Sequence, residues 1–167
     1  MAIRHPLFGA SPLAKYSLSH HAECDDHLSV EHPSVDAQHK VIFEHVEEVH
    51  NLCRHNASLA DLRVAVDQLN RTLETHFHYE ERMLAETPYP KLAEHAAQHR
   101  ALLDKLSAIR ESLAGDGKVS PDSGRELLDF LLAATVGHIV RSDIEYRRYV
   151  AANPVDELDV SITNMTI

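Results

Sequence analysis

The sequence SLADLRVAVDQLNRTLETHFHYEERMLAE, residues 58–86, decides the fold. Its apolar side chains recur every three or four residues, which places them on one face of an α-helix. These side chains are Leu59, Leu62, Val66, Leu69, Leu73, Phe77 and Leu84. Ser58 with Asp61 is typical of a capped helix start. The segment Thr87-Pro88-Tyr89-Pro90 must end this helix, because proline has no amide donor and restricts the residue before it.

Three further segments share this periodicity, and each is expected to be a helix. They run from Ser34 to about His55, from about Lys91 to the Gly115-Asp116-Gly117 break, and from the Ser120-Pro121 start to about Ala152. Glycine lets the chain leave a helix, and proline at the first helical position loses no hydrogen bond. Both kinds of break therefore support separate helices.

Helices joined by short breaks, without strand-like alternation between them, favour an all-α fold. We predict an up-down-up-down four-helix bundle at residues 34–153. An irregular N-terminal arm at 1–33 is predicted to precede the bundle, and a short C-terminal tail at 154–167 is predicted to follow it.

Composition limits the kind of protein this is. Of the 167 residues 44% are hydrophobic, which is enough apolar surface for one domain. No stretch approaches the roughly 18 uncharged apolar residues that span a membrane. The formal charge of −10 opposes binding to nucleic acid and anionic lipid. We therefore expect a soluble, cytoplasmic monomer that binds neither, with Cys24 and Cys53 as free thiols.

Histidine is frequent, with 14 residues, and several lie inside the predicted helices. An α-helix advances about 100° per residue, so side chains four apart lie about 40° from each other on one face. His76 and Glu80 have this spacing, and so do His95 and His99. Each pair can therefore hold one metal ion.

Simpler explanations exist for single residues of this kind. His39, on the apolar side of the first helix, would by itself more often be a hydrogen-bonded core residue than a metal ligand. Glu80 by itself would more often be a solvated charge. Two pairs on adjacent helices favour a metal, because several polar groups buried together are costly unless something satisfies all of them.

The last predicted helix contains His138-Ile139-Val140-Arg141-Ser142-Asp143. On an ideal helix, five residues place His138 and Asp143 about 140° apart. A shared ion would need a long side-chain reach or a π-bulge. Spacing alone therefore does not select Asp143.

Four motifs together resemble those of the hemerythrin family. They are Asp36-Ala37-Gln38-His39-Lys40, the His-Phe-x-x-Glu-Glu run that starts at His76, the pair His95 and His99, and the His-Ile-x-x-x-Asp run that starts at His138. The motifs occur in the family's order and spread from about Asp36 to Tyr146. The single His-x-x-x-His motif is weak evidence, whereas the whole set is specific.

The resemblance implies a non-haem centre of two iron ions with a bridging oxo or hydroxo group. Carried over residue by residue, it assigns His95, His99 and His138 to one iron, His39 and His76 to the other, and Glu80 and Asp143 to both. It also implies that O2 binds at the open position of the iron that has fewer histidines.

The chain departs from the family pattern near its fourth-helix histidine. The family commonly has a tryptophan four residues before this histidine, where Ala134 stands here. A leucine usually lines the O2 pocket three residues before the histidine, where this chain has Thr135. A hydroxyl there would hydrogen-bond the ligand or admit water, so we expect Thr135 to line the O2 pocket and to hasten autoxidation.

Reversible O2 binding by a carrier, store or supplier is the favoured function, with a redox or O2-consuming protein as a candidate partner. One alternative is a module that senses O2, nitric oxide or redox state through a partner protein. Another is a di-iron peroxidase or oxidase. Five histidines to two carboxylates argue against the ferritin-like oxidases, which use paired Glu-x-x-His motifs, but a peroxidase side activity stays open. A metal-free bundle is the remaining alternative.

Overall fold

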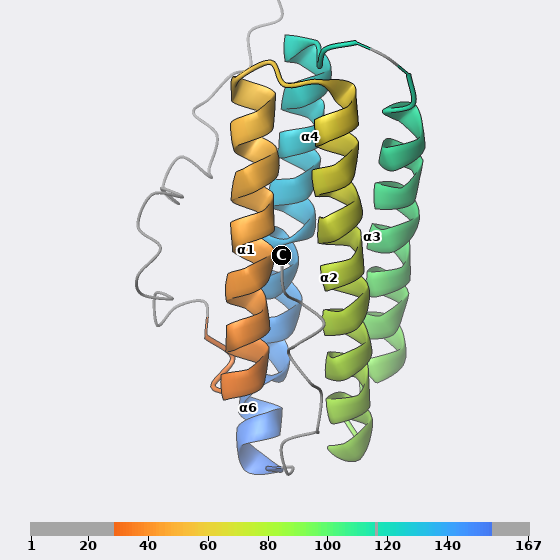
Figure 1. Ribbon diagram of the computed structural model, residues 1–167. Coiled ribbons are helices and arrows are strands. Elements are labelled where there is room, and N and C mark those ends of the chain that lie inside the picture. Colours follow the sequence, from red (N-terminus) through yellow and green to blue (C-terminus); the bar gives the residue numbers. More distant parts are fainter. Residues whose placement is uncertain (1–28, 116, 155–167) are drawn as a thin grey trace, which may run out of the picture.

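The computed structural model describes residues 29–115 and 117–154. Its elements, labelled in part in Figure 1, are α1 (Pro33–Arg54), α2 (Leu59–Glu86), α3 (Leu92–Ser112), α4 (Pro121–Ala134), α5 (Val136–His138), the π-helical turn η2 (Ile139–Asp143) and α6 (Ile144–Ala152). Most of the predicted N-terminal arm, at 1–28, and nearly all of the predicted tail, at 155–167, lie outside the described residues.

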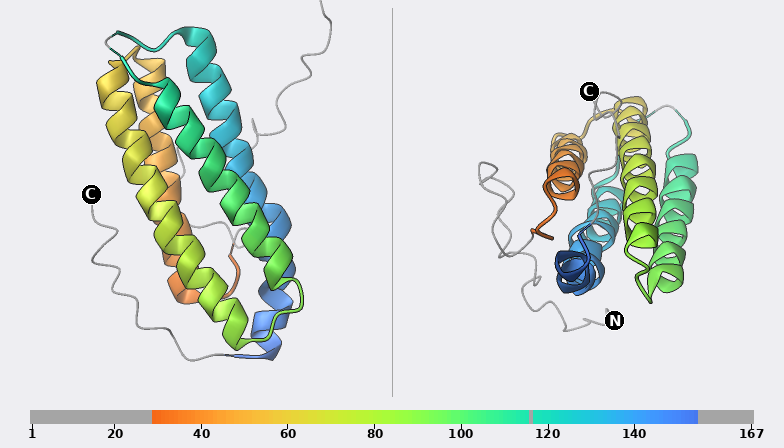
Figure 2. Two further views of the ribbon diagram at one scale, coloured as in Figure 1. Left: turned by 90° about the vertical axis from the view of Figure 1, so that its right-hand side faces the viewer. Right: turned by 90° about the horizontal axis from the view of Figure 1, so that it is seen from below.

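The helices form four long rods that pack side by side, and α4 to α6 together make the fourth rod (Figure 1). Helix α1 contacts α2 and α4, and α2 also contacts α3. The two views of Figure 2 show the rods running along one common direction, with short connections at both ends. Over the described ranges the chain has no strand beyond a single bridge between Ser58 and Lys118. The prediction of an all-α four-helix bundle is confirmed.

Side-chain caps fix two of the helix starts, as the sequence predicts. The Asp61 amide donates to Ser58 Oγ at 3.1 Å, and the Ser58 hydroxyl donates to Asp61 Oδ2 at 2.7 Å. At the start of α4 the Ser123 amide donates to Ser120 Oγ at 3.1 Å. Each cap satisfies an amide that has no partner within its own helix, which places the helix start at that residue.

The fourth rod is not the continuous helix that the sequence predicts. It is interrupted at Thr135, which lies between α4 and α5 and whose backbone has φ −93° and ψ −76°. The Thr135 hydroxyl donates to Leu131 O at 2.7 Å, and its amide donates to the same carbonyl at 2.8 Å. A threonine that bonds back to the preceding turn tends to bend a helix. The π-helical turn η2 begins four residues later, at Ile139, so this rod departs from a regular α-helix at two places.

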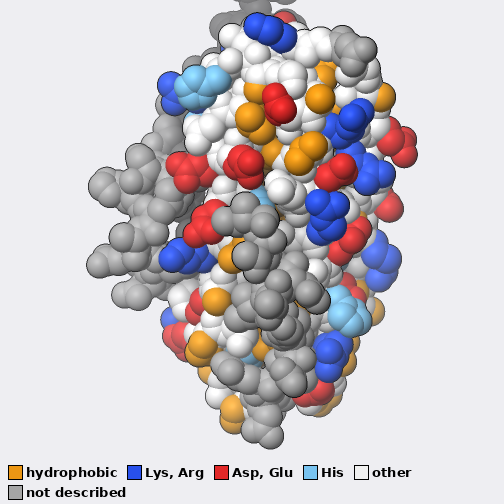
Figure 3. All heavy atoms as spheres, in the orientation of Figure 1, with side chains coloured by type: hydrophobic (Ala, Val, Ile, Leu, Met, Phe, Trp, Pro, Cys, Tyr) orange, Lys and Arg blue, Asp and Glu red, His pale blue; other side chains and the backbone are white. Residues whose placement is uncertain are grey.

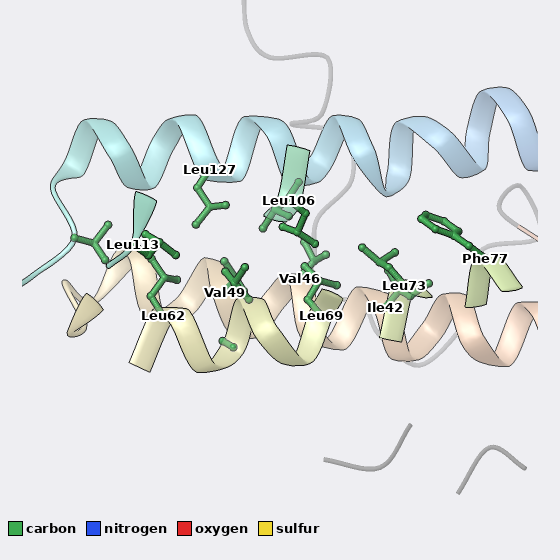
Figure 4. Packing of buried hydrophobic residues seen from close by; sticks show 14 residues of the cluster. Ile42, Val46, Val49, Leu62, Leu69, Leu73, Phe77, Leu106, Leu113 and Leu127 are labelled. Atoms are coloured by element: carbon green, nitrogen blue, oxygen red, sulfur yellow. The ribbon is translucent and has the colours of Figure 1, made fainter. Parts of the chain in front are cut away.

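The apolar core consists of two clusters that lie at different heights in the bundle. The first, shown in Figure 4, joins α1 to α4 and contains Ile42, Val46, Val49, Leu62, Leu69, Leu73, Phe77, Leu106, Leu113 and Leu127 among its members. The second contains Val30, Val35, Tyr79, Met83, Leu84, Tyr89, Tyr146 and Val150. Phe77 ends the first cluster, and Tyr146 belongs to the second. Both residues contact the site described below, which therefore lies between the two clusters.

The surface carries charges of both signs. In Figure 3 acidic and basic side chains alternate over the face that is drawn, with apolar side chains between them. No helix in the described part of the chain is both long enough and apolar enough to cross a membrane.

Replacing Leu69 by alanine tests the main core. Leu69 is completely buried in the first cluster, so the Leu69→Ala cavity should lower the free energy of unfolding by about 2–5 kcal/mol. Val64 lies on the same helix and is 55% exposed, so Val64→Ala should cost less than about 0.5 kcal/mol. Urea unfolding followed by circular dichroism measures both. Equal losses in the two variants would contradict the assignment of the core.

Candidate metal centre

Helices α2 and α3 each supply one pair of buried polar side chains. His76 and Glu80 come from α2, and His95 and His99 come from α3. Because each pair is four residues apart, both of its side chains leave the helix on one side. That side faces the bundle interior in both helices, and none of the four residues is more than 4% exposed.

The first and fourth rods complete the site. Helix α1 places His39 at 1% exposure, where it faces Asp143 of the fourth rod. His138 ends α5, and Asp143 ends the π-helical turn. In this wider turn the Ile144 amide donates to the Ile139 carbonyl five residues back. As a result the side chains of His138 and Asp143 meet, with His138 Nε2 at 3.2 Å from Asp143 Oδ1.

All seven predicted site residues therefore come together, and they form two groups. One group is Glu80, His95, His99, His138 and Asp143, and the other is His39, His76, Glu80 and Asp143. Within each group one donor atom per residue lies within 4.8 Å of all the others. The two carboxylates, Glu80 and Asp143, belong to both groups, so the groups are adjacent and share these side chains.

The histidine Nε2 atoms point at the shared carboxylates. His95 Nε2 lies 3.0 Å from Glu80 Oε2, and His99 Nε2 lies 3.2 Å from the same oxygen. On the other side, His39 Nε2 lies 3.4 Å from Asp143 Oδ2. The Nε2 atoms of His99 and His138 are only 2.9 Å apart. Such a convergence of nitrogen and oxygen lone pairs is the arrangement of a cation site.

Three residues outside the predicted set hold side chains of the site in position through hydrogen bonds. His76 Nδ1 lies 3.0 Å from Gln38 Oε1, and His99 Nδ1 lies 2.8 Å from Glu81 Oε1. The Tyr146 hydroxyl donates to Glu80 Oε1. Because Gln38 Oε1 and the Glu81 carboxylate are acceptors, the two histidines carry their protons on Nδ1 and present a bare Nε2 to the interior.

The sequence does not identify these three orienting residues. Glu81 follows Glu80 directly and is half-buried, and its carboxylate contacts His99. Gln38 and His76 lie 38 residues apart, and Tyr146 and Glu80 lie 66 apart, so no local spacing relates them. The one available signal is position, because Gln38 and Glu81 each stand next to a predicted ligand.

The donor set fits metal ions. Neither nitrogen of His39 and neither oxygen of Asp143 has a hydrogen-bond partner among the described residues, although all four atoms are buried. Burying unpaired nitrogen and carboxylate atoms is costly unless a cation coordinates them. Two cations between Glu80 and Asp143 would satisfy these atoms together with the inward Nε2 atoms.

The pKa shifts of His76, Glu80 and His138 agree with a metal-binding arrangement, whereas the shift of His95 has the opposite sign. Burial lowers the pKa of His138 to about 4 and lowers that of His76 well below its ordinary 6.5. Burial raises the pKa of Glu80, but the neighbouring His76, His95 and His99 outweigh burial, so the net pKa lies well below the usual 4.5. Burial also lowers the pKa of His95, but Glu80 outweighs it and the net shift is upward. Neutral imidazoles and ionised carboxylates are the forms that bind metals.

Comparison with known proteins adds an independent finding. Residues 32–149 match the hemerythrin HHE cation binding domain. The chain belongs to the hemerythrin family. The match covers the four rods almost completely and includes all seven residues of the two groups. The chain is therefore a hemerythrin-like cation-binding domain with a buried cluster of histidine, glutamate and aspartate.

Individual hemerythrins are similar over most of their length. The chain is 29% identical to a bacteriohemerythrin of Methylococcus capsulatus over 112 residues, which is 66% of this chain and 82% of that protein. It is 29% identical to a myohemerythrin of Riftia pachyptila over 124 residues, or 74% and 88%. A crystal structure of wild-type hemerythrin superposes with a TM-score of 0.59 and 27% identity, covering 71% of this chain and 88% of that one. The predicted family is confirmed.

The remaining predicted residue, Thr135, is buried next to the hemerythrin site residue His138. Its hydroxyl donates to Leu131 O at 2.7 Å, so the hydroxyl proton is already bound within the fourth rod. Two further histidines, His45 and His78, belong to neither of the two groups. His78 is exposed, but His45 is 6% exposed, because the buried stripe of α1 is wider than its apolar residues alone indicate.

The low pKa of His138 predicts a loss of stability in acid. Between pH 6.5 and about pH 4 the unfolded chain protonates this histidine and the folded chain does not, so falling pH favours unfolding. For the metal-free protein we expect His138 alone to lower the free energy of unfolding by about 3 kcal/mol between pH 7 and pH 4. Urea titrations measure this change. The His138→Gln variant should lose correspondingly less, and an equal loss in both proteins would contradict the shift.

Proposed function

We propose that this chain binds two iron ions and, through them, binds O2 reversibly. One observation carries the proposal: two adjacent groups of imidazoles share the same two carboxylates, Glu80 and Asp143. In this assignment the ligands of one ion are His95, His99 and His138, the ligands of the other are His39 and His76, and Glu80 and Asp143 bridge both. This is the assignment that the family resemblance implies.

The chemistry of the donors supports iron. Imidazole with carboxylate suits iron and other borderline ions, whereas soft metals prefer thiolate. Cys53, the cysteine within the described residues, packs against the first hydrophobic cluster and belongs to neither metal-binding group. Two carboxylates offset part of the charge of two ferrous ions, and a bridging oxo or hydroxo group would offset more.

The unequal ligand numbers support O2 binding. The group with two histidines offers one ligand fewer than the group with three. When bound, two ferrous ions supply an open coordination position and the two electrons that O2 accepts. The residues of the chain hold these ions in fixed positions and exclude water, since all seven site residues are at most 7% exposed.

The surroundings of the site favour binding over further reaction. The Phe77 ring stacks on His99 with centroids 3.8 Å apart and meets His138 edge-on at 5.9 Å. This apolar ring covers the side of the site that has three histidines. The Thr135 hydroxyl is bound to Leu131 O and has no spare proton to donate. With its proton held in this way Thr135 would not act as a general acid toward a bound ligand, which supports reversible binding.

The first test is an absorption spectrum with iron analysis. We expect about two iron ions per chain and a visible band that forms with O2 and disappears under vacuum. His76→Ala should lose iron and the band. His78→Ala, an exposed change two residues away, should keep both. If iron binds but O2 only oxidises it, the sensing or peroxidase alternative replaces reversible binding. If no iron binds, the proposal is wrong.

Thr135 is proposed to set the rate of autoxidation. Threonine is smaller and more polar than leucine, so Thr135→Leu should fill the pocket, exclude water and slow autoxidation by about tenfold, which equals roughly 1.4 kcal/mol in the barrier. Thr135→Val removes only the hydroxyl and separates polarity from volume. Decay of the O2-dependent band measures the rate. An unchanged rate in Thr135→Leu would show that this residue does not control autoxidation.

A further inference from the structure

Tyrosines gather at one end of the metal site. The sequence has five tyrosines and no tryptophan. Four of the five, Tyr79, Tyr89, Tyr146 and Tyr149, belong to the second hydrophobic cluster or pack against it. This cluster lies where α6 meets the end of α2 and the start of α3, at the lower end of the bundle in Figure 1. The first cluster, beyond the opposite end of the site, is aliphatic apart from Phe77 and the flanking Cys53 and Phe130.

Tyr146 connects this cluster to the metal site. It is completely buried, and its hydroxyl donates to Glu80 Oε1. Its ring also meets the ring of His95 edge-on, with centroids 5.7 Å apart. One tyrosine therefore contacts a carboxylate from α2 and an imidazole from α3, both of which belong to the proposed ligand set.

Two more rings continue from Tyr146 to the surface. Tyr89 meets Tyr146 edge-on at a centroid distance of 6.2 Å, and Tyr149 meets Tyr89 at 5.4 Å. Tyr89 is 8% exposed and Tyr149 is half-buried, so accessibility rises along the series. The Tyr149 hydroxyl donates to Pro88 O at 3.0 Å, at an exposed turn. Three rings in contact thus join the carboxylate of Glu80 to solvent.

Edge-to-face packing alone would account for three aromatic rings, but not for three tyrosines. Phenylalanine packs equally well and avoids burying a hydroxyl, which costs free energy unless it is bonded. Tyrosine differs from phenylalanine in one chemical respect that matters next to a redox metal: it can lose one electron together with its hydroxyl proton. The series therefore suits electron transfer.

We propose that Tyr146, Tyr89 and Tyr149 are an electron relay that carries electrons from a small phenolic donor at the surface to the metal site. The inference rests on the proposed di-iron function and adds a route and a class of donor to it. The donor meets the chain at Tyr149, and the buried end of the relay is Tyr146.

Each passage moves one electron inward. Tyr149 loses an electron to the site through Tyr89 and Tyr146, and its hydroxyl proton goes to water, which leaves a tyrosyl radical. A phenolic donor then gives one hydrogen atom, an electron with a proton, and restores the Tyr149 hydroxyl. Two passages deliver two electrons, which would return a bound pair of ferric ions to the ferrous state. With hydrogen peroxide as oxidant, two electrons and two protons convert one peroxide to two waters.

The test uses the iron-loaded full chain and two readouts. In the first, the oxidised protein is mixed with hydroquinone, and the rate of reduction is followed by absorbance. In the second, the oxidised protein receives hydrogen peroxide and a spin trap without a donor, and mass spectrometry locates the trapped radical. The unmodified chain should carry the adduct on Tyr149, and added hydroquinone should remove it.

Tyr89→Phe interrupts the relay while leaving Tyr149 in place. We expect it to slow reduction by about tenfold and to abolish the adduct on Tyr149. Tyr149→Phe should slow reduction similarly. Tyr79→Phe is the matched control, because Tyr79 belongs to the same cluster but its ring packs against His32, outside the three-ring series. It should change neither readout. Circular dichroism and iron content establish that each variant is folded and loaded.

The outcomes separate the two proposals. Full labelling of Tyr149 and an unchanged reduction rate in Tyr89→Phe, with iron bound, would overturn the relay and leave the di-iron proposal intact. A chain that binds no iron would overturn both. Equal slowing in Tyr79→Phe and Tyr89→Phe would also overturn the relay, because it would reduce the effect to packing in the cluster.

Discussion

The rest of the structure depends on the burial of two carboxylates, Glu80 and Asp143, in the centre of a helical bundle. Each is completely buried, and neither faces a lysine or arginine partner among the ion pairs of the described chain; both face histidines. An isolated buried carboxylate is costly, and neutral imidazoles cannot compensate two negative charges. Bound cations would offset the two charges, and the five imidazoles would supply further donor atoms to them. Metal binding would then contribute to the stability of the fold.

The bundle buries these seven polar side chains and still has an apolar core. Aliphatic side chains fill one part of the interior and a tyrosine-rich cluster fills the other, so the polar layer occupies only the height between them. Phe77 closes the layer on one side, and Tyr146 closes it on the other. These two residues also differ chemically, since a phenyl ring only shields the site whereas a phenol also bonds to Glu80.

The fourth rod shows how a local irregularity serves a site. An ideal helix would direct His138 and Asp143 away from each other, and the π-helical turn between them brings His138 Nε2 within 3.2 Å of Asp143 Oδ1. The break between α4 and α5 at Thr135 lies just before this turn, and the Thr135 hydroxyl and amide both donate to Leu131 O. Departures from regular helix are thereby concentrated where the ligands lie, whereas the other three rods stay regular.

The sequence by itself determined the helices, their caps and the pairs His76 with Glu80 and His95 with His99, because all of these depend on spacing within one helix. Family resemblance added Asp143, which spacing could not select. Only the tertiary structure decided that Gln38 and Glu81 orient ligating histidines, that Tyr146 bonds to Glu80 and that His45 is buried. These contacts, and the packing that buries His45, join residues on different helices. Their formation depends on how the rods pack and rotate against each other, which no periodicity within a single helix records.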